Sequence, residues 1–210
     1  MLRLLFKKNE YFIYIMKIIS LGGVGGCELA KALRNLNQET YPYDWLITAQ
    51  SFIIKSFNNI NNFFVFDDYN VYDTHKLLDV NKKAIMLHDF HNFYIEKDIV
   101  IQKYKRRFER LNTVLRSNDS ILFVRIYDNL EDKLVPLNYY DNIFTRDDEN
   151  MIKWNDFIIN IQNTFNNNKI KLLVITNKQN LCTVSENVIL HYTNNHTDKQ
   201  YIYNVIKTYI

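Results

Sequence analysis

The pattern of apolar and polar positions predicts strands and helices that alternate along most of the chain. Short apolar runs, typical of buried strands, occupy residues 17–21, 82–87, 120–127, 170–176 and 187–192. Apolar residues at helical spacing predict helices over residues 27–36, 46–57, 97–116, 147–166 and 198–209. The aromatic run at residues 63–66 is expected to form a short strand or to pack irregularly.

This alternation predicts an α/β fold, a three-layer domain with a mainly parallel sheet and helices on both faces. The strand segments are mainly apolar, as expected for a sheet that is covered on both sides. We expect one α/β domain over residues 16–210, because no linker-like stretch divides the chain. Residues 1–15 are expected to be a weakly ordered N-terminal extension, since Met16 begins a segment that resembles a natural start.

Polar residues follow four of the predicted strands. They are residues 22–27, His88 with Asp89, Tyr127 with Asp128, and Thr176 with Asn177. Ligands of open α/β sheets bind beyond the carboxyl ends of the strands. We therefore hypothesise that these residues converge, although the order of the strands cannot be deduced from the sequence.

All four glycines of the chain lie at positions 22, 23, 25 and 26, directly before Cys27. A dinucleotide-binding fingerprint would need a third glycine where Glu28 stands, and a P-loop would need a lysine after Gly26. A third interpretation places Cys27 at the start of a helix, where free amides and the helix dipole favour a thiolate. The amides at Gly25 and Gly26 would then stabilise an oxyanion. Alternatively, Cys27 is a small buried apolar residue and the glycines only permit a tight turn.

Several segments taken in order resemble a family of papain-like cysteine peptidases with members in bacteria and large DNA viruses. The resemblance rests on ISLGGVGGCELAKALRNL, TYPYDWLIT, LHDF, KYKRRFERL and ILFVRIY, and it covers roughly residues 17–127. Two extra residues separate Leu21-Gly22 from Cys27, and Tyr43 stands where the family has phenylalanine. Papain-like enzymes carry their histidine on an antiparallel sheet, whereas the alternating pattern predicts a mainly parallel one, and we retain the latter for the fold.

The resemblance implies thiol chemistry, and the residues suggest partners for it. His88 is the candidate base and acid for Cys27. Asp44 would orient His88, or else cap a helix that begins near Leu46. Arg125 lies inside an apolar strand and therefore needs a carboxylate such as Asp44, or a substrate anion.

The function predicted from these residues is that of a cysteine-dependent hydrolase or acyl transferase acting on a peptide or a small acyl substrate. The alternative is a non-peptidase enzyme or binding protein that holds a phosphorylated or other anionic ligand at the glycine-rich turn and Arg125. We expect no cofactor and no metal, since no CxxC or helical pair of histidines is present.

The composition of the chain mainly excludes certain classes of protein. A net charge of +3 and a pI near 8.7 do not predict specific binding of nucleic acid. No apolar run is long enough to span a membrane. Two cysteines do not make a disulfide framework, so a reducing, cytoplasmic location is expected, in the host if the protein is viral. Abundant Lys, Asn, Ile, Tyr and Phe suggest an AT-rich genome.

Overall fold

The structure, a computed structural model, describes residues 16–23, 26–36, 39–58, 60, 69–73, 76–79, 83–86, 89–127, 149–182, 185–195 and 198–210. The predictions for residues 1–15 and 63–66 lie outside these ranges. No helix in the described part of the chain is both long and apolar enough to cross a bilayer.

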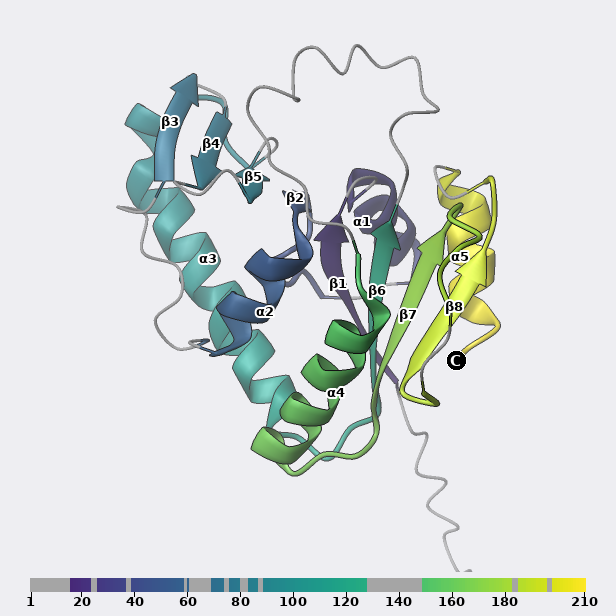
Figure 1. Cartoon of the computed structure of the whole chain (residues 1–210). Helices are drawn as coiled ribbons and strands as arrows, with labels where there is room; N and C mark the ends of the chain where they lie inside the picture. The colour runs from purple at the N-terminus through teal and green to yellow at the C-terminus, as the bar shows by residue number, and fades with distance from the viewer. Residues whose placement is uncertain are drawn as a thin grey trace, which may run out of the picture.

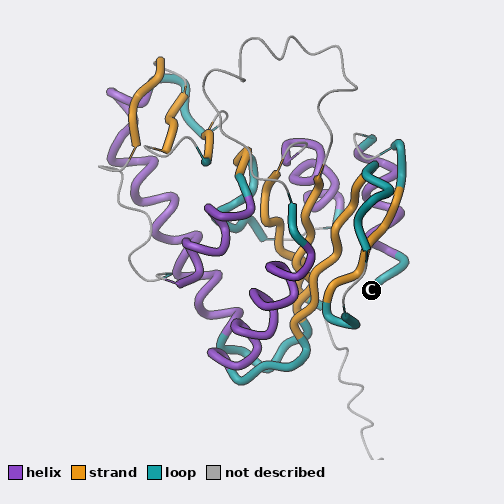
Figure 2. Tube along the Cα trace, viewed as in Figure 1, coloured by secondary structure: helices purple, strands orange, loops and turns teal. Residues whose placement is uncertain are grey.

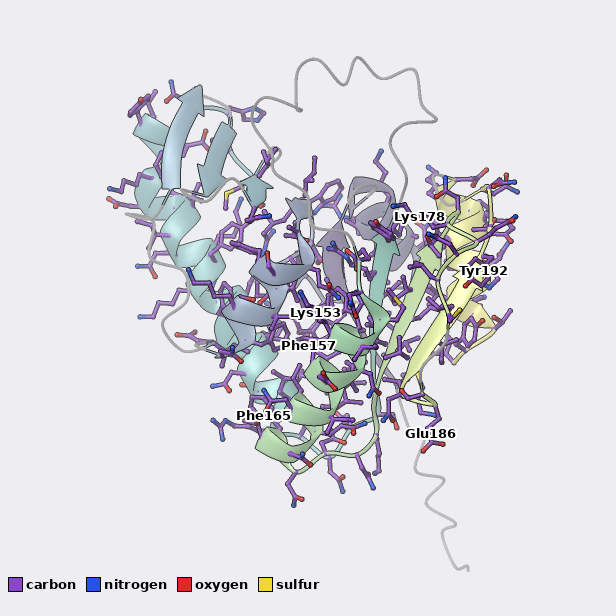
Figure 3. The ribbon with its side chains drawn as sticks, in the orientation of Figure 1. Lys153, Phe157, Phe165, Lys178, Glu186 and Tyr192 are labelled. Carbon is purple, nitrogen blue, oxygen red and sulfur yellow. The ribbon has the colours of Figure 1, made fainter. Side chains whose placement is uncertain are left out.

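A parallel sheet of four strands forms the centre of the molecule (Figure 1). The strands, in spatial order, are β1 (Lys17–Gly23), β6 (Ile121–Tyr127), β7 (Ile170–Thr176) and β8 (Val188–Tyr192). In Figure 3, Lys178, just after β7, and Glu186, just before β8, lie at opposite ends of the sheet. The connection between these strands therefore runs back along the sheet, as parallel pairing requires.

Helices cover both faces of this sheet, which confirms the predicted three-layer α/β fold. Leu122, Val124 and Ile126 pack in one core with α1 (Gly26–Asn35) and α5 (Lys199–Lys207). Ile121 and Phe123, which alternate with them, pack against α2 (Gln50–Asn58), α3 (Phe93–Leu115) and α4 (Met151–Phe165). Every residue of β6 is buried, and this explains why the strand is apolar at every position except Arg125.

A second, antiparallel sheet lies beside the first and is seen as a separate group of strands in Figure 2. Its strands, in spatial order, are β2 (Leu46–Thr48), β5 (Ala84–Met86), β4 (Lys76–Asp79) and β3 (Tyr69–Asp73). The prediction of one helix over 46–57 is wrong in its first part, because Leu46 to Thr48 pair with β5 and the helix begins only at Gln50. The strand predicted at 82–87 is β5, so the segment after it does not belong to the edge of the parallel sheet.

The long helix α3 begins at Phe93, four residues before the predicted start. The side chain of Asn92 accepts a hydrogen bond from the backbone N–H of Tyr94, and Glu96 Oε1 accepts from the N–H groups of His91 and Asn92, both at 2.9 Å. This reciprocal capping satisfies amides that the first turn of a helix leaves free. These backbone hydrogen bonds lower the pKa of Glu96.

Candidate functional site

The glycine-rich turn begins inside β1. The register with β6 shifts between Ser20 and Gly23, which is the mark of a β-bulge. Gly22 and Gly23 have φ angles of +68° and +108°. A Cβ on Gly22 would lie 2.8 Å from the Leu46 carbonyl oxygen, and one on Gly23 only 2.3 Å from that of Ile126. Two of the four glycines are therefore required by backbone conformation and by close approach of neighbouring strands.

Cys27 is the second residue of α1, directly beyond this turn. The structure thus has the strand, glycine turn and helix in the order that the sequence predicted, with Gly26 as the first helical residue. Gly25 lies outside the described residues. The Arg34 guanidinium carbon, later in α1, lies 4.6 Å from the centre of the Trp45 ring, so α1 contacts the turn at residues 41–45.

Asp44 is buried in that turn. Oδ2 accepts a hydrogen bond of 2.9 Å from the Tyr41 N–H, whereas Oδ1 has no partner among the described residues. Burial raises the pKa of Asp44 to about 7, although the Tyr41 amide and Arg107 act to lower it. Asp44 does not cap a helix at Leu46, because that residue begins a strand.

The raised pKa of Asp44 predicts that stability falls as the pH rises from about 4 to about 7. In this window the unfolded state releases the Asp44 proton while the folded state keeps it, so ionisation favours unfolding. In Asp44→Asn this slope is absent. We expect the stability of the wild type relative to Asp44→Asn to fall by about 1.4 kcal/mol per pH unit, and by about 4 kcal/mol at most.

Urea unfolding of the wild type and Asp44→Asn, measured at intervals between pH 4 and pH 8, checks this expectation. Asp156→Asn, at an exposed carboxylate on α4, is the control and should keep the wild-type slope. Parallel curves for the wild type and Asp44→Asn would contradict the assignment of a raised pKa to Asp44.

Asp89 is held by the basic helix α3. Arg107 Nη1 donates to Asp89 Oδ2 at 3.2 Å, Arg107 Nη2 lies 3.1 Å from Oδ1, and Lys103 Nζ lies 3.3 Å from Oδ1. The Tyr104 hydroxyl donates to the same carboxylate. These contacts give two residues of the basic run, Lys103 and Arg107, an acidic partner. They also fix the residue that directly follows His88, which itself lies outside the described residues.

Arg125 has an acidic partner, as predicted, but that partner is Glu149 instead of Asp44. Arg125 Nε and Nη2 donate to Glu149 Oε1 at 3.0 Å and 2.5 Å. Nη1 donates to the Leu21 carbonyl oxygen and to Thr48 Oγ1, and Nη2 also donates to the Thr48 carbonyl oxygen. A guanidinium carries five N–H groups, so every donor of Arg125 is used within the protein. No donor is left for Asp44 or for a substrate anion.

Comparison with protein-family models connects this arrangement to a known group. The model of a family described as "Putative papain-like cysteine peptidase (DUF1796)" matches residues 16–139, more than half of the chain. The chain belongs to this family. No curated protein and no solved structure matches the chain.

The match to the papain-like peptidase family spans β1, the glycine turn, Cys27, Asp44, Asp89 and Arg125. It ends before Glu149, which is the partner of Arg125. The sequence alone did not identify Glu149 as that partner. The available signal was the need of a buried arginine for a carboxylate, together with the acidic run DDE just before α4. That signal does not distinguish Glu149 from its two acidic neighbours.

The structure also has a groove of about 930 Å³ between α2 and α4. Its lining includes Gln50, Lys55, Asn150, Lys153 and Phe157, of which Lys153 and Phe157 are labelled in Figure 3. Of the predicted site residues whose side chains the structure describes, neither Asp44 nor Arg125 lines this groove. Among the described residues, no cluster of three or more His, Cys, Asp or Glu side chains could hold a metal ion.

Proposed function

We propose that the protein is a cysteine-dependent hydrolase or acyl transferase with Cys27 as its nucleophile. The observation that carries the proposal is the location of Cys27, second in α1 and directly after the glycine turn at the carboxyl end of β1. Free amides and the helix dipole at that end lower the pKa of a thiol and favour the thiolate. Membership of the papain-like peptidase family supports peptide or other acyl substrates.

His88 is the proposed base and acid, oriented by Asp44. The antiparallel strand β5 ends two residues before His88, and Asp89, which follows it, acts electrostatically on Asp44. Asp44 Oδ1, buried and without a partner among the described residues, is the acceptor that we propose for the His88 ring. Asp89 is a poorer choice as orienter, because α3 already engages both of its carboxyl oxygens.

The proposed reaction follows from these roles. His88 takes the thiol proton, and the Cys27 sulfur forms a bond to the substrate carbonyl carbon. The resulting oxyanion accepts hydrogen bonds from the turn amides, with Gly25 and Gly26 as our candidates. His88 then donates its proton to the leaving group, whose bond to the carbon breaks. Water, deprotonated by His88, or another acceptor releases the acyl group from sulfur.

The alternative of an anionic ligand at the glycine turn and Arg125 is less well supported. It needs a free guanidinium, whereas the donors of Arg125 are all engaged by Glu149, Thr48 and Leu21. A thermal-shift experiment with phosphorylated metabolites still separates the two functions. Stabilisation that persists in Cys27→Ser would favour the anion-binding alternative.

Replacement of the nucleophile is the direct test of the proposed function. In a Cys182→Ser background, which removes the exposed second thiol, Cys27→Ala should abolish labelling by an electrophilic acyl probe. His88→Ala should slow labelling at pH 7 by about 100-fold, within the usual range for loss of a general base. Both are measured as labelling rates by mass spectrometry.

Circular dichroism should show that both variants keep the wild-type fold. Lys169→Ala, at a residue on the amino-terminal side of β7, is the control and should label at the wild-type rate. Labelling of the Cys27→Ala variant at the wild-type rate would end the proposal.

A further inference from the structure

The Arg125–Glu149 ion pair contacts the segment of chain that leads to Cys27. Arg125 Nη1 donates a hydrogen bond of 3.1 Å to the Leu21 carbonyl oxygen. A Cβ placed on Gly23 would lie 3.1 Å from the same nitrogen and 3.2 Å from the guanidinium carbon. The guanidinium therefore packs directly on the glycine turn, four residues before Cys27.

Thr48 of β2 holds the turn from a second direction. Its Oγ1 accepts from Arg125 Nη1 at 2.7 Å and donates to the Leu21 carbonyl oxygen at 3.0 Å. A Cβ on Gly22 would lie 2.9 Å from Thr48 Oγ1. Leu21, Gly22 and Gly23 are thus fixed by a triangle of hydrogen bonds and by close packing against β2 and β6.

Glu149 fixes the arginine in turn. Its Oε1 accepts from two nitrogens of Arg125, and its Oε2 accepts from the Trp154 indole N–H. The backbone N–H of Glu149 donates to the Tyr127 hydroxyl at 3.4 Å. Each group of the pair is therefore constrained by several elements, and both side chains are almost fully buried.

Stability alone does not account for such a pair. Burying two charges carries a large desolvation cost, and well-packed apolar residues of similar volume often stabilise a protein equally well. Apolar residues do not provide directed hydrogen bonds to the backbone of the glycine turn. The N–H groups of Arg125 that do not reach Glu149 all donate to Leu21, at the start of that turn, or to Thr48 of β2, which packs against it.

We propose that Arg125 is a positioning residue, anchored by Glu149, that holds the glycine turn in the geometry that the Cys27 thiolate requires. The inference rests on the proposed function, because it assigns a purpose to a turn that precedes the nucleophile. Arg125 acts through the backbone of residues 21–23 and not on the substrate, since it has no donor to spare.

The pH dependence of Cys27 alkylation tests this role. The rate of reaction with iodoacetamide is measured between pH 5 and pH 10 in the full chain with Cys182→Ser. Arg125→Lys keeps the positive charge opposite Glu149, but its single nitrogen cannot also donate to both Leu21 and Thr48. Thr48→Val keeps the shape and the ion pair, and removes only the hydroxyl that joins Arg125 to Leu21.

We expect either substitution to raise the apparent pKa of the Cys27 thiol by about one unit, and so to reduce alkylation at pH 7 about tenfold. Arg116→Lys, the same exchange at an exposed residue at the end of α3, should leave the profile unchanged. Circular dichroism identifies the variants that fold, and only these are interpreted. If Arg125→Lys does not fold, Thr48→Val, which retains the ion pair, decides the question.

The outcomes separate the positioning role from the proposed function. A shifted profile in a folded variant supports the inference. A lowered thiol pKa in the wild type that neither folded variant alters overturns the inference and leaves the function standing. A wild-type thiol that titrates at its ordinary pKa of about 8.5 overturns both.

Discussion

Glu149→Ala is expected to lower the free energy of unfolding by about 3–5 kcal/mol, as is typical when one partner of a buried ion pair is removed. The substitution leaves the Arg125 charge buried without its carboxylate. It also removes the acceptor of the Trp154 indole N–H, and this loss is costly because Trp154 is fully buried. Unpaired buried donors and charges retain their desolvation cost in the folded state and lose the compensating interaction.

Urea unfolding at neutral pH measures this effect. Asp156→Ala removes a carboxylate from the exposed face of α4, the helix that follows Glu149, and should change stability by less than about 0.5 kcal/mol. Similar small changes for the two variants would mean that the Arg125–Glu149 pair makes no net contribution.

Gly23→Ala is expected to destabilise the fold by about 2–5 kcal/mol, through backbone strain and overpacking together. A φ of +108° is unfavourable for any residue with a side chain. The new Cβ would also lie 2.3 Å from the Ile126 carbonyl oxygen, which is a backbone atom and cannot rotate away. Either β1 separates from β6 at this point or the bulge is lost.

The comparison with Asn35→Ala, an alanine substitution at an exposed residue of α1, isolates the effect of the turn. Both variants are followed by thermal and urea unfolding. Gly23→Ala with wild-type stability would show that the turn can relax without cost. The backbone that leads to Cys27 would then not be fixed by the conformation of Gly23.

The strands of the parallel sheet and the helices that cover it could be predicted because their patterns are strong and local. The run at 121–127 is apolar at every position except Arg125, since both faces of the strand are buried in the structure. The antiparallel sheet could not be predicted in the same way. β2 has only three residues, and their apolar spacing continues into α2 without a break, so the periodicity cannot separate strand from helix. Only the pairing with β5, distant in sequence, makes Leu46 to Thr48 a strand.

The antiparallel sheet also bears on the difference between the family resemblance and the predicted fold. The alternating pattern predicted a mainly parallel sheet, and the resemblance implied a histidine on an antiparallel one. The structure contains both kinds of sheet, and the strand that precedes His88 belongs to the antiparallel sheet. His88 itself lies outside the described residues, so its role stays a prediction.

For the candidate site, the sequence indicated which residues need partners but not which partners they find. An arginine inside an apolar strand requires a carboxylate, and this much could be predicted for Arg125. The choice of Glu149 depends on how α4 returns over the sheet after β6, which no local pattern encodes. Asp44 shows the same limit, since its burial follows from the packing of the 41–45 turn against α1 and α3.

The pairing of β1 with β6 gives the chain a particular order of assembly. Lys17 lies opposite Ile121, so this contact closes a loop of roughly a hundred residues, whereas β6, α4 and β7 are neighbours along the chain. Closing a long loop carries its entropic cost before the contacts that offset it can form, which favours early formation of the β6–α4–β7 unit. On a ribosome, β1 would emerge before β6 and would have to wait for its partner strand. The glycine turn that leads to Cys27 continues from β1, so the surroundings of residue 27 would be complete only after β6 has been synthesised.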